Sequence, residues 1–376
     1  MKKLYSSLLF TLIILGAQAG PWTQMASMGG LGRHRAFSFS IGSHGYVGGG
    51  WNSNVFYYDM WEYDPATNSW AQKANLPTYM WSDPGFGIGN KGYVVEGGYT
   101  YMYTPLTNTW NIVNFNSPSA TYYDQMKFTI NGKGYICDDT YIWEFDPQTN
   151  NWIIVYTLSF PFYGDLAFAA NNKGYFVDVY YNDCFEFDPT SASITMKSPL
   201  PATNSQATSF GVNGKGYVGL GQVGIDDVRE FYEYDPMTDS WRGINRMEGD
   251  ARENATAFTI GNTAYVACGT NGINHNDLWQ FDNTKVTGII EQNNPDEFFV
   301  FPNPSVDGKF FVKQEGGGMK NMSAQVFDAA GKLVKVEKLQ QNSTIDLSAS
   351  PNGNYHLVLL DAWQHAVASK KLVLQK

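Results

Sequence analysis

The sequence is poor in charge, histidine and cysteine. Charged residues make up 16% of its 376 residues, against about 25% in average domains, so long charged helices are not expected. Of the five histidines, no two are spaced as metal ligands, and Gly-x-Ser-x-Gly, HExxH and phosphate-loop motifs are absent. We therefore expect no catalytic residue that the sequence alone can assign, no metal and no cofactor.

Basic residues are also few, with 25 Lys and Arg against 35 Asp and Glu and a net charge of −10. That balance argues against a nucleic-acid partner, whose phosphates would be repelled. The three cysteines, Cys137, Cys184 and Cys268, have no paired spacing and lie in apolar or aromatic runs. We expect buried thiols in strands, with a single disulfide as the alternative.

Long apolar runs are missing after the first 19 residues, so no transmembrane segment is expected in the mature chain. Residues 1–19, MKKLYSSLLFTLIILGAQA, combine two lysines, a short apolar core and a final Ala-x-Ala. This pattern is typical of a secretory signal peptide. We expect the mature protein to begin near Gly20, outside the cytoplasm.

Aromatic residues are abundant at 16%, and they recur in six copies of one pattern. Each copy has a Gly-Tyr pair, then an aromatic-acidic-aromatic-Asp-Pro segment, then usually a Trp five residues after the Pro. The pairs lie 40 to 48 residues apart, at 45–46, 92–93, 134–135, 174–175 and 216–217, with Ala264-Tyr265 as the sixth. A repeat of this length is typical of a propeller or a solenoid.

Within each copy the apolar residues alternate with period two between turn-forming Asn, Gly and Asp-Pro segments. The copy therefore predicts four short antiparallel strands, which make one propeller blade. Trp22 resembles the Trp strand of a blade that has no Gly-Tyr pair before it, whereas the sixth copy lacks its Trp. We expect the first strand to complete the last blade and so close the ring.

Three features of the first copy, Gly48-Gly49-Gly50, Tyr63 and Trp70, make this region similar to the Kelch-repeat β-propellers. The resemblance implies an all-β fold with a six-bladed propeller over residues 20–287. Blades 3 and 4 depart from the family pattern, because Asp138-Asp139 and Asp178-Val179 replace the glycine pair.

Residues 288–297 are predicted to be a linker, and residues 298–376 a small β-sandwich, because their apolar residues alternate with period two around turns. The segment resembles the C-terminal sorting domain of type IX secretion cargo. This implies a partner, the type IX machinery, and a location that is secreted or at the outer-membrane surface of a Gram-negative bacterium. The matching residues are 301–304 (FPNP), Gly308, Phe327-Asp328, 331–333 (GKL), Asp346-Leu347, Pro351, Gly353, Tyr355 and 371–373 (KLV).

Propellers bind ligands at one mouth of the axial channel, through the loops that enter the innermost strands and those that leave the second strands. Aligning the copies on Gly-Tyr brings polar and aromatic residues to two equivalent positions of the entering loops, a mixture suited to a sugar or a protein surface. Arg33 and Arg252 align two residues further out and are expected to pack on neighbouring strands. The candidate ligand-binding residues are Arg35, Trp81, Tyr123, Asp124, Gln206, Glu253 and Asn254.

Three functions remain open at this point. The first is a non-enzymatic binding module for a glycan or a protein, and we favour it because no nucleophile or metal set is present. The second is a sugar mutarotase or epimerase, since six-bladed Kelch propellers include N-acetylneuraminate epimerase; Arg35 with Glu253 or Asp124 would supply the charged groups. The third is a structural surface protein. Copper chemistry of the galactose oxidase type is not expected, and the acidic pairs 138–139 and 226–227 are interpreted as solvated, with Ca²⁺ as the alternative.

Overall fold

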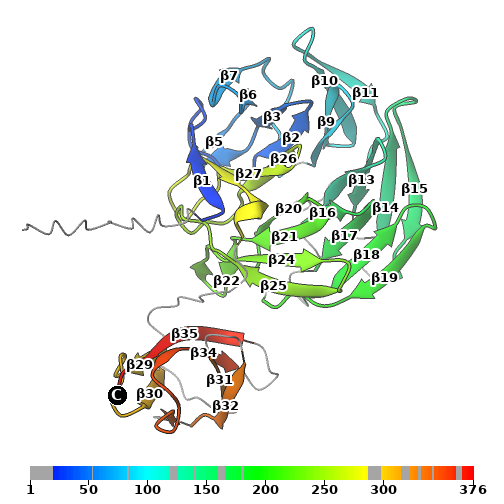
Figure 1. Ribbon diagram of the computed structural model, residues 1–376. Helices are drawn as coiled ribbons and strands as arrows, with labels where there is room; N and C mark the ends of the chain where they lie inside the picture. The colour runs from blue at the N-terminus through cyan, green and yellow to red at the C-terminus, as the bar shows by residue number, and fades with distance from the viewer. Residues whose placement is uncertain are drawn as a thin grey trace, which may run out of the picture. The chain divides into compact units, whose positions relative to one another are not determined.

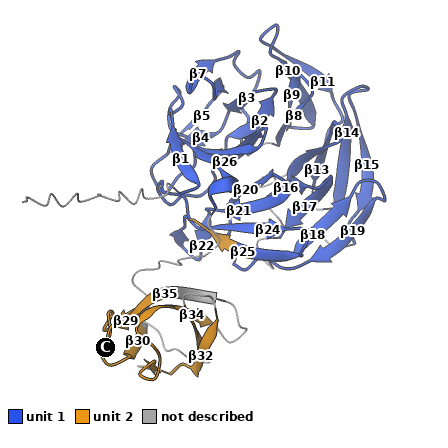
Figure 2. Cartoon of the chain, in the orientation of Figure 1, with its two compact units in different colours: residues 1–242, 246–287 blue, residues 243–245, 288–376 orange. Residues whose placement is uncertain are grey.

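The computed structural model divides the chain into two compact units (Figure 2). The first comprises residues 1–242 and 246–287, and the second residues 243–245 and 288–376. The predicted signal peptide and the predicted linker lie outside the described residues. Those are 20–52, 54–82, 84–118, 126–138, 140–159, 166–178, 182–202, 204–286, 298–314, 322–328, 332–340, 343–360 and 366–376.

The first unit is a propeller of six four-stranded antiparallel sheets arranged around an axis (Figure 1). This confirms the predicted fold class, with one blade for each repeat. From the axis outward, the first three blades are β2 (Phe37–Ile41), β3 (His44–Gly48), β6 (Met60–Asp64) and β7 (Ser69–Gln72); β8 (Gly85–Ile88), β9 (Lys91–Glu96), β10 (Tyr99–Thr104) and β11 (Thr109–Asn114); and β12 (Lys127–Ile130), β13 (Lys133–Cys137), β14 (Tyr141–Asp146) and β15 (Asn151–Thr157).

The other three blades follow the same order. They are β16 (Leu166–Ala170), β17 (Lys173–Val177), β18 (Cys184–Asp188) and β19 (Ser193–Lys197); β20 (Thr208–Val212), β21 (Lys215–Gly219), β24 (Phe231–Asp235) and β25 (Ser240–Ile244); and β26 (Thr256–Ile260), β27 (Thr263–Ala267), β28 (Leu278–Phe281) and β1 (Trp22–Met25). Two small hairpins extend blades 1 and 5: β4 (Trp51–Asn52) with β5 (Val55–Phe56), and β22 (Gln222–Val223) with β23 (Asp226–Asp227). A single 3₁₀ turn, Asn283–Lys285, follows β28.

The sixth blade takes its outer strand from the start of the chain. Strand β1 pairs antiparallel with β28, with Trp22 opposite Phe281. The Trp22 side chain is 3% exposed, and its ring lies 4.7 Å from that of Phe231 and 4.8 Å from that of Phe281. The predicted closure of the ring is therefore confirmed.

The glycine of the Gly-Tyr pair is explained by contact between blades. A Cβ on Gly92 would lie 2.3 Å from the ring of Phe39, which belongs to the innermost strand of the preceding blade. Real Cβ atoms do not approach that closely, so at this position only glycine lets the phenylalanine ring lie against the next sheet. The same contact recurs at Gly45 with Phe258 (2.0 Å), Gly134 with Phe86 (2.5 Å), Gly174 with Phe128 (2.1 Å) and Gly216 with Phe168 (2.0 Å).

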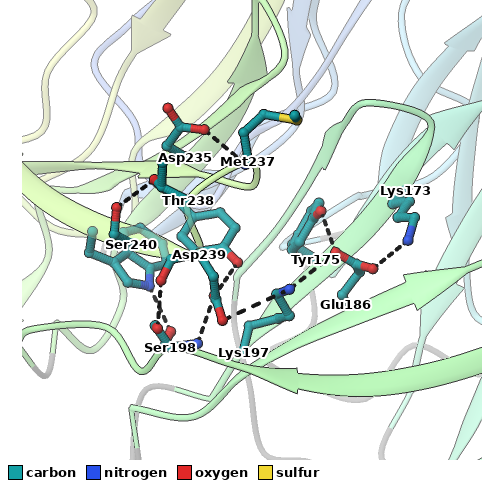
Figure 3. Close-up of polar contacts among 12 residues, drawn as sticks. Lys173, Tyr175, Glu186, Lys197, Ser198, Asp235, Met237, Thr238, Asp239 and Ser240 are labelled. Carbon is teal, nitrogen blue, oxygen red and sulfur yellow. Dashed lines mark hydrogen bonds and ion pairs between the residues drawn. The ribbon is translucent and has the colours of Figure 1, made fainter.

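In blades 5 and 1 the turn and the Trp of the repeat also join neighbouring blades, and Figure 3 shows the contacts of blade 5. In blade 5, Asp239 takes a positive φ of 49° and accepts hydrogen bonds from the Tyr234 hydroxyl at 2.7 Å and from the Ser198 amide of blade 4 at 2.9 Å. The Trp241 indole donates to the Ser198 carbonyl at 2.9 Å. Blade 1 repeats this pattern, with Asn68, Tyr63, Trp70 and Ala26 in the corresponding places. These repeat residues therefore form hydrogen bonds with the preceding blade as well as within their own.

The second unit is a β-sandwich. A three-stranded sheet, β29 (Phe298–Phe301), β30 (Lys309–Gln314) and β33 (Ser343–Asp346), faces a four-stranded sheet. The latter has the order β32 (Leu333–Lys338), β31 (Ser323–Asp328), β34 (Gly353–Leu360) and β35 (Ala366–Leu374). One buried cluster joins both sheets, and it includes Phe310, Val312, Ile345, Val326, Leu357 and Leu372.

The three cysteines are buried and form no disulfide, so the expectation of buried thiols is confirmed and the alternative of a disulfide is wrong. Burial raises the pKa of the Cys268 thiol to about 12, which keeps it protonated and unreactive at neutral pH. No helix within the described part of the chain is long and apolar enough to cross a membrane.

Candidate ligand-binding site at one mouth of the propeller

The candidate site is organised by a turn that repeats at the start of successive innermost strands. Arg35, Ser82, Gln206 and Asn254 occupy equivalent positions, and all have φ between 53° and 60°. The Asn254 amide donates to the Gln206 carbonyl at 2.8 Å, Arg35 to Asn254 at 3.0 Å, and Ser82 to Arg35 at 2.9 Å. These backbone hydrogen bonds join blades 5, 6, 1 and 2 in a partial ring at the axis, which fixes where the four side chains begin.

Three of the predicted residues meet through their side chains. Gln206 Oε1 accepts hydrogen bonds from Asn254 Nδ2 at 2.7 Å and from Arg35 Nη2 at 3.2 Å, and Gln206 Nε2 donates to Gln222 Oε1 at 3.2 Å. The Arg35 guanidinium carbon lies 5.1 Å from the centroid of the Trp81 ring, within the range of a cation–π contact. Residues from four blades thus converge, although they are far apart in sequence.

Glu253 is the acidic member of this group. Burial raises the pKa of its carboxyl, and the nearby Asp227 carboxylate adds to the shift, whereas Arg35 and a hydrogen bond with Asn254 oppose it. Its Oε2 atom is buried and has no hydrogen-bond partner. Such an oxygen favours the neutral, protonated form of the acid. We call Arg35, Gln206, Asn254 and Glu253 the polar cluster.

Aromatic side chains that the sequence analysis did not select lie beside the polar cluster. The Trp51 and Trp81 rings are 5.9 Å apart, Phe56 lies 6.2 Å from Trp81, and Tyr79 lies 5.3 Å from Phe56. We call Trp51, Phe56, Tyr79 and Trp81 the aromatic strip. Strands β4 and β5 present two of its members, and the bridge between His34 and Trp51 ties that hairpin to the loop carrying Arg35. The available signal was the aromatic composition of the insertion after the second strand of repeat 1, because the insertions at the same place in repeats 5 and 6 contain no Phe, Trp or Tyr.

Arg33 and Arg252 have a different role from their neighbours at the mouth. Both are fully buried, and each binds an aspartate of its own blade with two hydrogen bonds: Arg33 with Asp59 at 2.6 and 2.9 Å, and Arg252 with Asp277 at 2.5 and 2.9 Å. Burial opposes ionisation of Asp277, but Arg252 holds the pKa of its carboxyl below the ordinary value. The two arginines therefore anchor loops within their blades. Arg33 also donates to the Gly49 carbonyl at 3.2 Å and Arg252 to the Cys268 carbonyl at 3.0 Å, directly after β3 and β27, so both contact neighbouring strand ends as expected.

Two of the predicted ligand-binding residues are not described, and Asp138, from one of the acidic pairs, has a structural role. Tyr123 and Asp124 fall outside the described residues. Asp138 accepts hydrogen bonds from the amides of Thr140 and Tyr141 at 2.9 and 2.6 Å and from the Trp143 indole at 2.6 Å, so it stabilises a turn. Within the described ranges no group of three or more His, Cys, Asp or Glu side chains could hold a metal ion.

The six innermost strands enclose an axial cavity of about 290 Å³. Its lining includes hydroxyl groups from several blades, with Lys127 as the charged residue of the described lining. The hydroxyl-bearing side chains that line it are Ser38, Ser40, Thr129, Thr208, Ser209 and Thr259. The cavity is therefore a polar, weakly charged channel.

The fold defines the chain as a six-bladed β-propeller joined to a small β-sandwich. Residues 33–77 match the Kelch motif, and residues 299–375 match the secretion system C-terminal sorting domain. The propeller therefore contains a Kelch motif, and the chain carries a C-terminal sorting domain of the type IX secretion system, which indicates secretion or attachment at the outer-membrane surface.

A solved structure titled "Structure of YjhT" is similar to the propeller. The TM-score is 0.58 at 14% identity, over 70% of this chain and 98% of that one. At this identity the similarity shows the fold alone. No curated protein matches the chain significantly.

Proposed function

We propose that the protein is a secreted, non-enzymatic binding module that takes a carbohydrate at the mouth bearing the polar cluster. The observation that carries the proposal is the convergence of Arg35, Gln206, Asn254 and Glu253 beside the Trp81 ring. Amide and guanidinium groups that are already held in place can donate to and accept from sugar hydroxyls, and an aromatic face can stack on the apolar face of a pyranose ring. A protein ligand is the alternative outcome of the test.

The export route follows from the domain order that we propose for the chain. Residues 1–19 act as the signal peptide for the inner membrane, residues 20–287 form the propeller, and residues 288–297 link it to the sorting domain. Residues 298–376 engage the type IX machinery for passage through the outer membrane. The mouth of the propeller would then face molecules outside the cell.

The test is binding of the mature chain, residues 20–376, to a broad panel of glycans. Arg35→Ala and Gln206→Ala should each weaken binding about tenfold or more, because each removes a hydrogen bond and leaves polar neighbours unpaired. Met237→Ala is the control, since this side chain is 84% exposed on a turn after a third strand. A chain that binds no glycan in the panel would contradict the proposal.

A sugar mutarotase or epimerase is the second candidate, and one observation favours it. Burial raises the pKa of Glu253, and the nearby positive charge of Arg35 partly offsets that rise. A group able to exchange a proton therefore lies near a cation able to hold a sugar carboxylate. Anomer interconversion should be slowed in the double variant Arg35→Ala, Glu253→Ala. If interconversion of the tested sugars is as fast with the variant as with the unmodified protein, the enzymatic candidate is excluded.

A further inference from the structure

The aromatic strip adjoins the polar cluster and is formed by residues of blades 1 and 2. Trp81 links the two, because its ring contacts Arg35 and also lies near both Trp51 and Phe56. Phe56 is 42% exposed and Tyr79 is 46% exposed. The strip therefore adds two exposed rings to the site.

The strip is held in place by its own contacts. Trp51 and Phe56 stack with an interplanar angle of 21°, and the hairpin that carries them is closed by pairing of Trp51 with Phe56 and of Asn52 with Val55. Asn52 Nδ2 donates to the Tyr57 hydroxyl at 2.6 Å, beside the rings. Flat ring faces bordered by amide and hydroxyl groups, presented by a fixed hairpin, form a preorganised surface.

We propose that the ligand is an oligosaccharide chain, with one terminal unit in the polar cluster and the following units stacked on the aromatic strip. This inference rests on the proposed function and deepens it, because a single sugar would fill the polar cluster and leave the strip uncovered. Each pyranose unit presents an apolar face to a ring and hydroxyl groups to its polar border. Several aromatic rings beside one hydrogen-bonding centre therefore suit several linked units.

The charge around the site indicates a largely neutral chain. Arg35 is the cation of the polar cluster, and the Asp227 carboxylate lies near enough to Glu253 to raise the pKa of its carboxyl. The other groups of the polar cluster are amides, and no member of the aromatic strip is charged. A polyanionic glycan would meet one cation, Arg35, beside the negative charge of Asp227, so a largely neutral chain fits better.

Aliphatic side chains on the same mouth offer a matched comparison. Ile225 follows the short strand β22 of blade 5 and is 91% exposed, and Ile273 lies in the corresponding loop of blade 6 and is 71% exposed. A broad protein partner would bury such tips together with the strip, since apolar contacts drive protein association. A sugar chain that stacks on rings would not need them.

The experiment measures the affinity of the mature chain for soluble β-1,4-linked glucose, xylose and N-acetylglucosamine series of one to six units. Affinity of the unmodified protein should rise with chain length. Phe56→Ala and Tyr79→Ala should each lower the affinity for the longest bound oligomer about tenfold and leave the affinity for the monosaccharide unchanged. Ile225→Ala and Ile273→Ala should change neither of these affinities.

Two further variants separate stacking from general apolar contact. Phe56→Tyr keeps a ring and should retain affinity for the oligomer, whereas Phe56→Leu keeps apolar volume and should lose it. The oligosaccharide inference is overturned if affinity is independent of chain length, or if the variants of the aromatic strip weaken binding of all chain lengths equally. It is also overturned if the two isoleucine variants weaken oligomer binding as much as the variants of the aromatic strip do. In those cases glycan binding itself stands; absence of carbohydrate binding in both this series and the broad panel would overturn the proposed function as well.

Discussion

At the scale of the residue, adjacent side chains have opposite roles. Arg252 is buried and paired with Asp277, whereas Glu253 reaches the mouth with one oxygen unpaired. The sequence could select Arg35, Gln206, Asn254 and Glu253, because the repeat puts the first three at one aligned position and Glu253 at the position before it. It could not identify Trp51 and Phe56, because they lie in an insertion that only some repeats have and whose aromatic residues occur in repeat 1 alone. Only the folded hairpin brings them to Trp81.

Glu253 should make stability depend on pH. Burial raises its pKa above the ordinary value of 4.5, so the folded chain retains the proton at pH values where the unfolded chain has lost it. Its stabilising contribution is therefore complete below pH 4.5 and is lost as pH rises through the folded pKa. Glu253→Gln should raise the free energy of unfolding at pH 7.5 by about 1 kcal/mol and leave it unchanged at pH 4.

Urea unfolding of both proteins at the two pH values measures this difference. Gln206→Glu is not a suitable control, because it adds charge to the polar cluster; Gln280→Glu, on β28 outside it, tests the effect of a carboxylate alone. An equal change at pH 4 and pH 7.5 would mean that Glu253→Gln acts through packing and not through the proton.

At the scale of the element, the strands could be predicted because each is marked by alternating apolar residues and turn residues within one repeat. The contact between the Gly-Tyr glycine and the phenylalanine of the preceding blade could not, because it joins residues of different repeats. The sixth blade has Ala264 in that place and still forms the sheet, so the need for glycine depends on the local fit of each ring.

Gly92→Ala should destabilise the propeller by about 1–3 kcal/mol, because the added methyl group overlaps the buried ring of Phe39. Phe39→Leu alone removes ring contacts and should also destabilise the propeller. The double variant should cost less than the sum of the two, since the smaller side chain makes room for the methyl group. Chemical denaturation of the three variants gives the coupling energy; strictly additive costs would show that the two residues do not meet in solution.

At the scale of the whole molecule, six similar units can bury their faces only by meeting in a ring, and the chain closes that ring with its first strand. The number of blades followed from the repeat count, and the closure from the missing Trp of the last copy. The ligand did not follow, because the mouth is built from loops that vary between copies. The sorting domain gives the location of the protein and says nothing about what the propeller binds.

Trp22→Ala tests the closure. It removes a buried ring that contacts Phe231 and Phe281 and should cost about 3–5 kcal/mol. Trp70→Ala is the matched control, because Trp70 has the same place opposite Tyr63, but its strand stays joined to β6 by a short turn. Both variants should lower the melting temperature, whereas only Trp22→Ala should free β1 and make residues 20–26 sensitive to limited proteolysis. An unchanged melting temperature for Trp22→Ala, or equal protease resistance of the two variants, would show that the ring does not depend on this strand for closure.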